Sequence, residues 1–500
     1  MPRQFRLSLH AAALLASVSL VSAPLAAQQA GQAQSGQAQA GVRSISQADR
    51  AAGSKANPDL IAEFGGAVTG SQAAYVEGVG KTIALQSGLG NARSDFTVTL
   101  LNSPVNNAFA IPGGYVYVTR QLVALMNNEA ELAGVLGHEV GHVAARHSAK
   151  RQKASTRNSI FGVLGTVLSG VLLGDGALGQ LGQQIFSKGS QILTLKFSRA
   201  QETQADNLGI QYLRGAGYDP RAMSTVLASL AGQTALDARL MGSTGERSPE
   251  WASTHPDPAS RVRAAAARAG TTATGATNRD VFLTRIDGIM YGDDPKQGVV
   301  EGQTFIHPEF RLTFQAPRGF YLVNGTRSVS ISGQSGKGEL STAAFDGNLE
   351  RYVGSVFAGL TQQGQAQIDV GAIQRTTVNG LPAAYGTARV ASGNGQLDVT
   401  VFAYQFSANQ AFHFVTLTPA GQGNVFGPLY SSMRRITANE AAAVKPRRID
   451  VVAARTGDTV QSLAGRMAYS NGQLERFLVL NGLNSDARIV AGQKVKIVTF

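Results

Sequence analysis

The sequence has no cysteine among its 500 residues. Disulfide bonds are therefore excluded, and so is the lipid attachment of a lipoprotein, which requires a cysteine. The stability of the chain must come from core packing or from a bound metal. Cysteine usage does not decide whether the chain is exported, so that question depends on the N-terminal segment alone.

Long hydrophobic runs are scarce as well. The run at 160–174, IFGVLGTVLSGVLLG, is about five residues shorter than a bilayer-spanning helix requires. We expect a glycine-rich helical hairpin packed within its domain or at an oligomer interface, with membrane contact as the alternative. Residues 1–27 begin with arginines and end in small residues. This layout predicts a signal peptide cleaved near Ala27 rather than an uncleaved anchor helix.

Acidic residues are outnumbered, with 32 Asp and Glu against 44 Lys and Arg, for a net charge of +12. Such an excess favours anionic surfaces of the cell envelope or nucleic acid. Export disfavours nucleic acid as a partner and leaves peripheral association with the envelope. The alternative is a basic, solvated surface with no specific partner.

The length exceeds one compact core and predicts about two to three domains. Residues 28–43 are rich in Gln, Ala and Gly, which is typical of a flexible linker. Residues 44–269 are mainly helical in pattern, with one strand or hairpin expected around the PGG turn at 112–114. Residues 270–437 instead alternate between strands and Gly/Asn-rich turns. The latter predicts a β-rich α+β domain of unknown role. A linker at 438–448 then leads to a small unit at 449–500, so we expect a multidomain α+β chain.

Histidine is rare too, yet three of the seven lie within ten positions. Asn128, with Glu131 three residues later, predicts the start of a helix. On that helix His138 and His142 are one turn apart, so both imidazoles can reach one ion. Glu139 lies between them and is placed to act as general base toward an attacking water. This HExxH arrangement usually binds zinc.

The third histidine of the cluster, His147, has a different position. It lies five residues beyond His142, about 140° around an ideal helix, and is expected to face away from the metal. We interpret it as a helix-end cation or a packing residue. A third histidine ligand follows a glycine turn in HExxHxxGxxH, where this chain has Ala145 and Ser148. Two of the three histidines are therefore predicted ligands.

A catalytic zinc requires a third protein ligand. The segment FSRAQETQADNLGIQYL predicts a helix that starts with a capping box of Ser198 and Gln201. Glu202 and Asp206 share one face of this helix, and Glu202 is the predicted ligand. Asp206 is predicted to accept the second ring N–H of a ligating histidine and so fix its tautomer. Without the upstream histidines, this pair would be interpreted as an ordinary solvated helix face.

Four segments, taken in order over residues 45–268, resemble the HtpX/BepA-like zinc metallopeptidases, relatives of the CAAX prenyl proteases. They are NAFAIPGGYVYVTR, NNEAELAGVLGHEVGHVAARH, SRAQETQAD and AGYDP. The resemblance implies a zincin-like, mainly helical domain with one zinc ion per chain. It assigns the zinc to His138, His142 and Glu202, with Glu139 as catalytic base and Asp206 as an outer partner.

The same resemblance concerns three further features. It implies that Asn107, Ala108 and Phe109 belong to an edge strand that holds peptide substrate by backbone hydrogen bonds. The family often has a second acid where this chain has Gln204. In STHPDPASRV, His255 resembles a His-Pro motif whose loop can cap the zinc and keep the enzyme latent. His255 could instead stabilise an oxyanion, or be a simple loop residue.

The C-terminal segments GDTVQSLA, LNGL and AGQKVKIV resemble a LysM module, a small βααβ unit. The resemblance implies binding of N-acetylglucosamine chains such as those of peptidoglycan, with a retained fold lacking a ligand as the alternative. The central β-rich region resembles Mog- and PsbP-like sandwiches, and we assign it no activity.

Together these features predict an exported zinc metalloendopeptidase of the periplasm or envelope. Its expected substrates are misfolded envelope or outer-membrane proteins, and the LysM-like module would tether it to the wall. The alternatives are a peptidoglycan-binding scaffold with a latent or inactive peptidase domain, and an enzyme that cleaves wall peptides.

Overall fold

The computed structural model describes residues 44–148, 197–240, 255, 258–272, 275–364, 370–392 and 395–500. The predicted signal peptide (1–27), the predicted linker (28–43) and the apolar run at 160–174 fall outside these residues. No helix in the described part of the chain combines the length and apolar character needed to cross a bilayer.

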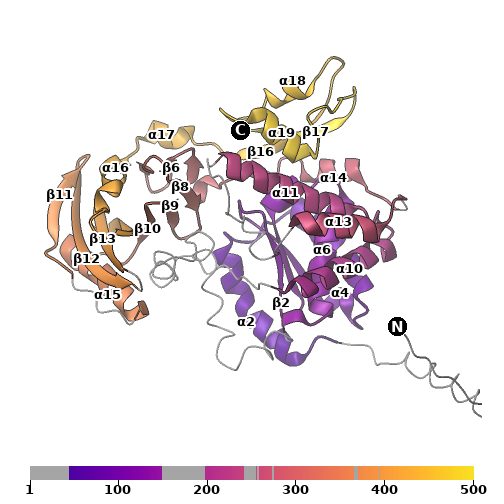
Figure 1. The fold of residues 1–500 in the computed structure, drawn as a ribbon, viewed down its shortest axis with the longest axis horizontal. Helices are drawn as coiled ribbons and strands as arrows, with labels where there is room; N and C mark the ends of the chain where they lie inside the picture. Colours follow the sequence, from indigo (N-terminus) through magenta and orange to yellow (C-terminus); the bar gives the residue numbers. More distant parts are fainter. Residues whose placement is uncertain are drawn as a thin grey trace, which may run out of the picture. The chain divides into compact units, whose positions relative to one another are not determined.

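The region around the HExxH motif is mainly helical, as predicted, and contains one small sheet (Figure 1). Its elements are α2 (Gln47–Glu63), α3 (Ser71–Ala84), η1 (Leu85–Ser87), α4 (Ala92–Asp95), β1 (Thr97–Leu101), β2 (Ala108–Ile111), β3 (Tyr115–Thr119), α5 (Arg120–Leu125), α6 (Glu129–Ala144), α10 (Arg199–Gly215), α11 (Ala222–Leu240), α13 (Pro258–Ala269) and α14 (Arg279–Ile286). β3 pairs in parallel with β1 and antiparallel with β2, which makes β2 an edge strand of this sheet. The hairpin predicted at PGG is confirmed, and β1 is a strand that the sequence pattern did not indicate.

Helix α6 carries the motif and is buried on every side. All residues from Glu129 to His142 are buried, because α6 packs against α3, α10, α11 and β2. The predicted N-cap is confirmed, since the Asn128 side chain accepts a hydrogen bond from the Glu131 N–H at 2.9 Å. The Glu131 carboxylate accepts from the N–H of Asn127, at 2.7 Å, instead of closing the box on Asn128.

Glycines allow α10 to approach α6 closely. A Cβ atom on Gly209 would lie 3.1 Å from the backbone nitrogen of His138, and one on Gly141 would lie 3.2 Å from Leu208 Cβ. Larger side chains at these two positions would push the helices apart. The close packing of α10 against α6 therefore brings the first turn of α10, which carries Glu202, to the face of α6 that carries the histidines.

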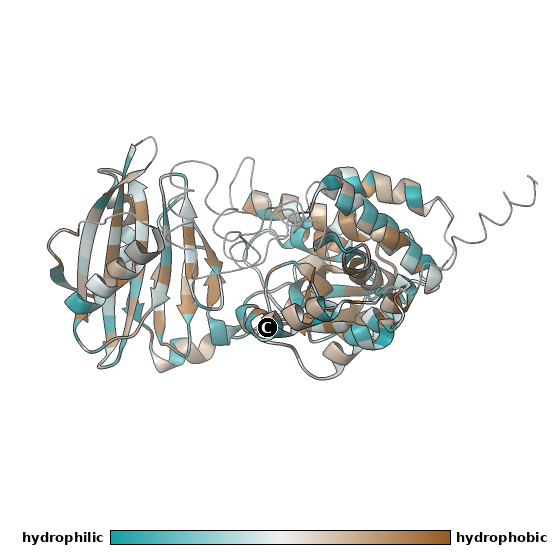
Figure 2. Cartoon of the chain, turned by 90° about the horizontal axis from the view of Figure 1, so that it is seen from below, coloured by the Kyte–Doolittle hydropathy of each residue, from teal (hydrophilic) through white to brown (hydrophobic). Residues whose placement is uncertain are grey.

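The region that follows is rich in antiparallel strands, as predicted. Its elements are β4 (Met290–Tyr291), η2 (Pro295–Gln297), β5 (Val299–Glu301), β6 (Thr304–His307), β7 (Leu312–Gln315), β8 (Tyr321–Asn324), β9 (Val329–Gly333), β10 (Gly336–Thr342), α15 (Leu349–Gly364), β11 (Gln374–Val378), β12 (Leu381–Ser392), β13 (Gly395–Ser407), β14 (Gln410–Pro419), η3 (Gly423–Phe426), α16 (Gly427–Ser432) and β15 (Arg434–Arg435). Two sheets have the orders β11-β12-β13-β14-β10-β9-β8 and β15-β7-β6-β5. Hydrophobic residues recur along the strands (Figure 2), and α15 packs on β12 and β13.

Two histidines of this region, His307 and His413, are buried and contact neighbouring aromatic residues. His413 is buried, and its Nδ1 lies 2.8 Å from the Tyr352 hydroxyl. His307 accepts a hydrogen bond from the Phe310 N–H at 3.3 Å and stacks on the same phenylalanine ring. Burial lowers the pKa of both imidazoles to about 4.

The C-terminal segment comprises α17 (Ala438–Ala443), β16 (Arg447–Ala453), α18 (Val460–Ala464), α19 (Gln473–Asn481) and β17 (Lys494–Thr499). From β16 to β17 the order is βααβ, and β4 adds a third strand beside β16. Its apolar side chains belong to the same hydrophobic core as α6. They include Ile449, Val460, Leu463, Phe477, Leu480, Val495 and Ile497.

A buried lysine strengthens this packing. The Lys496 ammonium, with no exposed surface, donates to the carbonyls of Ala124 (2.8 Å), Leu125 (3.2 Å) and Met126 (2.5 Å). These carbonyls lie at the C-terminal end of α5, where backbone acceptors lack helical partners and cations bind favourably. The C-terminal unit is therefore packed against the helical region by both apolar and ionic contacts.

Candidate metal centre

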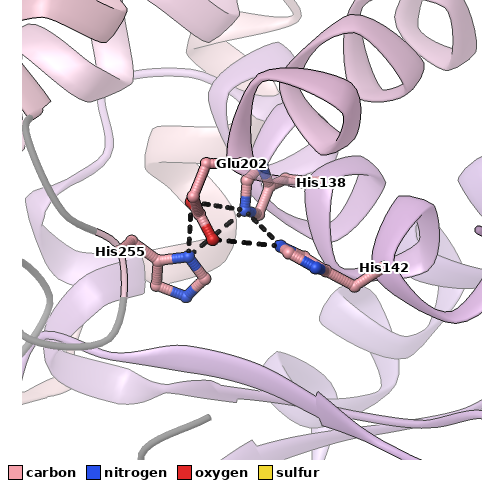
Figure 3. Close-up of side chains that lie close together, drawn as sticks. All are labelled: His138, His142, Glu202 and His255. Atoms are coloured by element: carbon pink, nitrogen blue, oxygen red, sulfur yellow. Dashed lines mark hydrogen bonds and ion pairs between the residues drawn. The ribbon is translucent and has the colours of Figure 1, made fainter. Parts of the chain in front are cut away.

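The predicted ligands converge from two helices on one point (Figure 3). His138 and His142 project from α6, and their Nε2 atoms are 3.0 Å apart. Glu202 comes from the first turn of α10, which begins with the predicted capping box of Ser198 and Gln201. Its carboxylate oxygens each lie 3.5 Å from one of the two Nε2 atoms. All three side chains are buried, with at most 3% of their surface exposed.

These separations suit a tetrahedral ion. Zinc ligands at roughly 2.0–2.1 Å from a tetrahedral ion lie about 3.3 Å from one another. The measured 3.0, 3.5 and 3.5 Å bracket that value. Two imidazole nitrogens and one carboxylate oxygen also form one of the donor sets of catalytic zinc. Geometry and donor chemistry therefore both fit the predicted metal.

Charge balance leads to the same conclusion. Asp206 accepts from His138 Nδ1 at 2.8 Å, the position predicted for a carboxylate that orients a ligand. Arg261, from α13, donates to both Asp206 oxygens, at 2.6 and 2.8 Å, and lies 2.9 Å from Glu202. Together with Glu139, three buried carboxylates face one guanidinium. With both histidines neutral, as metal binding requires, a divalent cation would balance the two excess negative charges, which are costly to bury alone.

The ionisation of the ligands follows from these contacts. Burial lowers the pKa of His138, but the hydrogen bonds of Asp206 and Glu202 outweigh it and raise that pKa to about 9. Burial holds the pKa of His142 well below its usual value. Burial raises the pKa of Glu202, but His255, His138 and His142 hold it well below its usual range. Burial likewise raises the pKa of Asp206, but Arg261 and His138 hold it well below its usual range.

Glu139, the predicted base, lies beside the ligands. It is 1% exposed, and neither carboxylate oxygen has a hydrogen-bond partner among the described residues. Burial raises the pKa of this carboxyl. A buried acceptor without a donor is costly unless a ligand or water fills the space. Glu139 is therefore free to bind a water or substrate proton at this position.

His255 joins the cluster from outside the two helices. Its Nδ1 lies 3.3 Å from His138 Nε2 and 3.0 Å from Glu202 Oε2, both close to the spacing of tetrahedral ligands. Its Nε2 is 3.6 Å from Glu139 Oε1. One ligand atom from each of His138, His142, Glu202 and His255 lies within 4.8 Å of the others. This arrangement favours the capping role over the oxyanion role.

His147 is a buried packing residue and not one of the converging ligands, as predicted, but it folds back onto His142 where an ideal helix would turn it away. Helix α6 ends at Ala144, and Arg146 adopts a left-handed backbone with φ 55°, which turns the chain back. His147 is fully buried, with its Nδ1 2.9 Å from the Nδ1 of His142. Its Nε2 is 3.0 Å from Gln204 Oε1.

Of the three residues expected in an edge strand, Ala108 and Phe109 lie in β2 and Asn107 precedes it. β2 lies at the edge of its sheet, and Ala108 and Phe109 pair with Val118 and Tyr117 of β3. Asn107 precedes the strand and is fully buried, and neither its side-chain oxygen nor its nitrogen has a partner in the described residues.

A shallow hollow adjoins the end of β2 and the predicted ligand His142. Its lining is mostly apolar with two charged side chains, and includes Ile45, Asp49, Leu89, Ala110, Ile111, Pro112, Val143 and Arg146. An extended chain bound along β2 would have room for a side chain here.

Sequence reasoning missed Arg261 and misjudged the direction of His147. A buried Asp206 beside a neutral ligand requires a cation, but sequence spacing does not say which arginine supplies it. The position of His147 depends on where α6 ends, at Ala144, and a projection on an ideal helix takes no account of that end.

A buried pair of imidazoles with a carboxylate ligand and a free glutamate defines a zinc metallopeptidase of the HExxH type. Residues 70–269 match the model of Peptidase family M48, and residues 454–498 match that of the LysM domain. The chain therefore contains a domain similar to the M48 peptidases and a LysM domain near its C-terminus. The predicted resemblance to HtpX/BepA-like zinc metallopeptidases is thereby confirmed.

Several curated relatives are similar over this domain. The "Beta-barrel assembly-enhancing protease" of Yersinia pestis is 32% identical over 226 residues, 44% of each chain. Its Escherichia coli K12 counterpart is 32% identical over 198 residues, covering 39% of this chain and 38% of the relative. The "Mitochondrial metalloendopeptidase OMA1" of Arabidopsis thaliana is 38% identical over 133 residues, 27% and 25% of the two chains. The chain thus spans less than half the length of these relatives.

Among solved structures, cyanobacterial PsbP from Synechocystis matches 27% of this chain and 91% of its own, with 13% identity and a TM-score of 0.22. A match at this level carries no functional argument.

Proposed function

We propose that the chain is an exported zinc endopeptidase that hydrolyses peptide bonds of envelope proteins. The observation that carries the proposal is the convergence of His138, His142 and Glu202 on one buried point. Beside it lies the carboxylate of Glu139, which accepts no hydrogen bond from the described residues. The similarity to bacterial proteases named for enhancing β-barrel assembly supports misassembled outer-membrane proteins as substrates.

The residues of the site divide the chemistry. A zinc ion held there would supply Lewis-acid polarisation of the scissile carbonyl and of water. Glu139 accepts the proton of the attacking water and donates it to the leaving amine. Asp206 holds His138 with its Nε2 facing the ligands, and Arg261 fixes Asp206. β2 would align an extended polypeptide by backbone hydrogen bonds, as edge strands commonly do.

Cleavage of casein tests the proposal. We expect zinc-dependent cleavage by the wild type and a fall of at least about 100-fold in kcat for Glu139→Gln, because one general base contributes that much. Zinc content should remain one per chain in this variant. Equal turnover by the wild type and Glu139→Gln would reject the mechanism.

A resting, latent state has specific support from His255. A zinc site with four protein ligands keeps no open position for water, and His255 lies where a fourth ligand would bind. A capped site of this kind would also be expected in the alternative, a scaffold with a latent peptidase domain. For His255→Ala, a rise in casein turnover supports a cap. A collapse supports stabilisation of the transition state instead, and no turnover in either protein favours the scaffold.

The LysM domain would bind peptidoglycan and hold the enzyme at the cell wall. Because this domain shares its core with α6, we propose that it positions the peptidase rigidly and is not a flexible tether. Co-sedimentation with purified sacculi tests the binding. Release of muropeptides in the same assay would instead favour cleavage of wall peptides.

A further inference from the structure

The two predicted histidine ligands are held by chemically different partners. His138 Nδ1 lies against the carboxylate of Asp206, which can only accept when ionised. His142 Nδ1 lies instead against another imidazole, that of His147, at 2.9 Å. An imidazole can accept or donate, so by itself His147 does not determine where the proton of His142 resides.

The next residue in the chain of contacts removes that ambiguity. His147 Nε2 is 3.0 Å from the side-chain oxygen of Gln204, which can only accept a hydrogen bond. With the Gln204 amide in this orientation, His147 carries its proton on Nε2, and its Nδ1 has a lone pair. That lone pair accepts the Nδ1–H of His142, which leaves the Nε2 of His142 unprotonated and facing Glu202.

We propose that His147 and Gln204 are positioning residues that fix the tautomer of His142 required to bind zinc. The inference rests on the proposed function, because it assigns these residues a role toward the zinc of that enzyme. If the Gln204 amide were reversed, its N–H would donate to Nε2 of His147. The protons of His147 and His142 would then each occupy the other ring nitrogen. The proton of His142 would then occupy Nε2 and block the metal.

Packing fixes the orientation of the His142 ring but does not decide which ring nitrogen carries the proton. Phe197 stacks on His142 with ring centroids 3.9 Å apart and planes inclined by 25°. Such a contact holds the plane of the imidazole without distinguishing its two tautomers. The Gln201 side chain also contacts the His147 carbonyl, at 3.5 Å, and so helps to hold the returning chain. The choice of tautomer therefore depends on the hydrogen bond to Gln204.

Gln204 is exposed, so its substitution should leave the fold intact. Gln204→Lys places a donor where the chain needs an acceptor, and its matched control is Thr203→Lys at the exposed neighbouring position. Outer partners of metal-binding histidines typically contribute about 10–100-fold in metal affinity. We expect the zinc Kd, measured by chelator competition, to rise by that factor in Gln204→Lys relative to Thr203→Lys.

A conservative variant provides the rescue. Gln204→Glu keeps an acceptor and should bind zinc at least as tightly as Thr203→Glu, which adds the same charge nearby. His147→Phe keeps the ring volume but removes both nitrogens, and should lose about 10–100-fold in affinity. Equal zinc affinities for Gln204→Lys and Thr203→Lys would overturn the proposal even if His147→Phe failed to fold.

Nitrogen NMR of histidine-labelled, zinc-loaded protein provides a readout independent of activity. We expect His147 with its proton on Nε2 and His142 with its proton on Nδ1. A proton on Nδ1 of His147 overturns the assignment. If the wild type binds no zinc, the proposed function fails together with this inference. Zinc binding and casein cleavage with unchanged affinity in Gln204→Lys reject this inference alone.

Discussion

Lys496 permits a quantitative test of how the LysM domain is attached. Its ammonium is fully buried, with three backbone carbonyls at the end of α5 as partners, and it is close enough to Glu131 to interact electrostatically. In Lys496→Met the side-chain volume is nearly kept, but the carbonyls lose their donor and Glu131 loses its nearby cation. Removing one partner of a buried ionic contact typically costs about 3–5 kcal/mol.

The matched control is Lys494→Met, two residues earlier on β17. Lys494 is partly exposed and its ammonium contacts only the Thr284 hydroxyl, at 3.2 Å, among the described residues. Its replacement should change the free energy of unfolding by no more than about 0.5 kcal/mol.

Urea unfolding, followed by circular dichroism and by hydrogen exchange in α5 and α6, measures both variants. We expect Lys496→Met to lower the free energy of unfolding by about 3–5 kcal/mol and to speed exchange in both helices. A result within about 0.5 kcal/mol of Lys494→Met would refute the view that this domain is part of the peptidase core.

Three further predictions concern the bound metal and two buried charged or titratable groups, Arg261 and Glu339. Chelation should lower the Tm of the wild type, because zinc stabilises only the state that binds it, and should have little effect on Glu202→Gln. Arg261→Met should destabilise the zinc-free protein by about 3–5 kcal/mol, since two buried carboxylates lose their cation. Its zinc-induced rise in Tm, measured by calorimetry, should therefore exceed that of the wild type, and a smaller rise contradicts this account. Burial raises the pKa of Glu339 to about 8, so the native state keeps a proton that the unfolded chain loses above pH 4.5. The free energy of unfolding should therefore fall by roughly 1.4 kcal/mol per pH unit between pH 4.5 and about 8. Urea unfolding of Glu339→Gln at several pH values should show no such contribution.

The ligands were predictable because their geometry is local. His138 and His142 are one helical turn apart, and any helix through them places both imidazoles on one face. Glu202 was found through a capping box and through the need for a third ligand. The edge hairpin at PGG was likewise indicated by local turn chemistry. Each of these signals lies within about ten residues of the feature it predicts.

The remaining parts of the site depend on contacts that no local pattern specifies. Arg261 reaches Asp206 only because α13 packs against α10. His147 returns to His142 because α6 ends three residues earlier, in a turn that an ideal helix does not contain. Lys496 lies 371 positions from Leu125, one of its hydrogen-bond partners, and its sequence surroundings look like an ordinary strand. Long-range packing decides all three positions.

The most direct test of the central claim is anomalous diffraction at the zinc edge from crystals supplied with zinc. The account predicts one strong peak per chain, about 2.0–2.2 Å from the Nε2 atoms of His138 and His142 and from the carboxylate of Glu202. No peak at this point, or zinc bound only elsewhere on the chain, would contradict it.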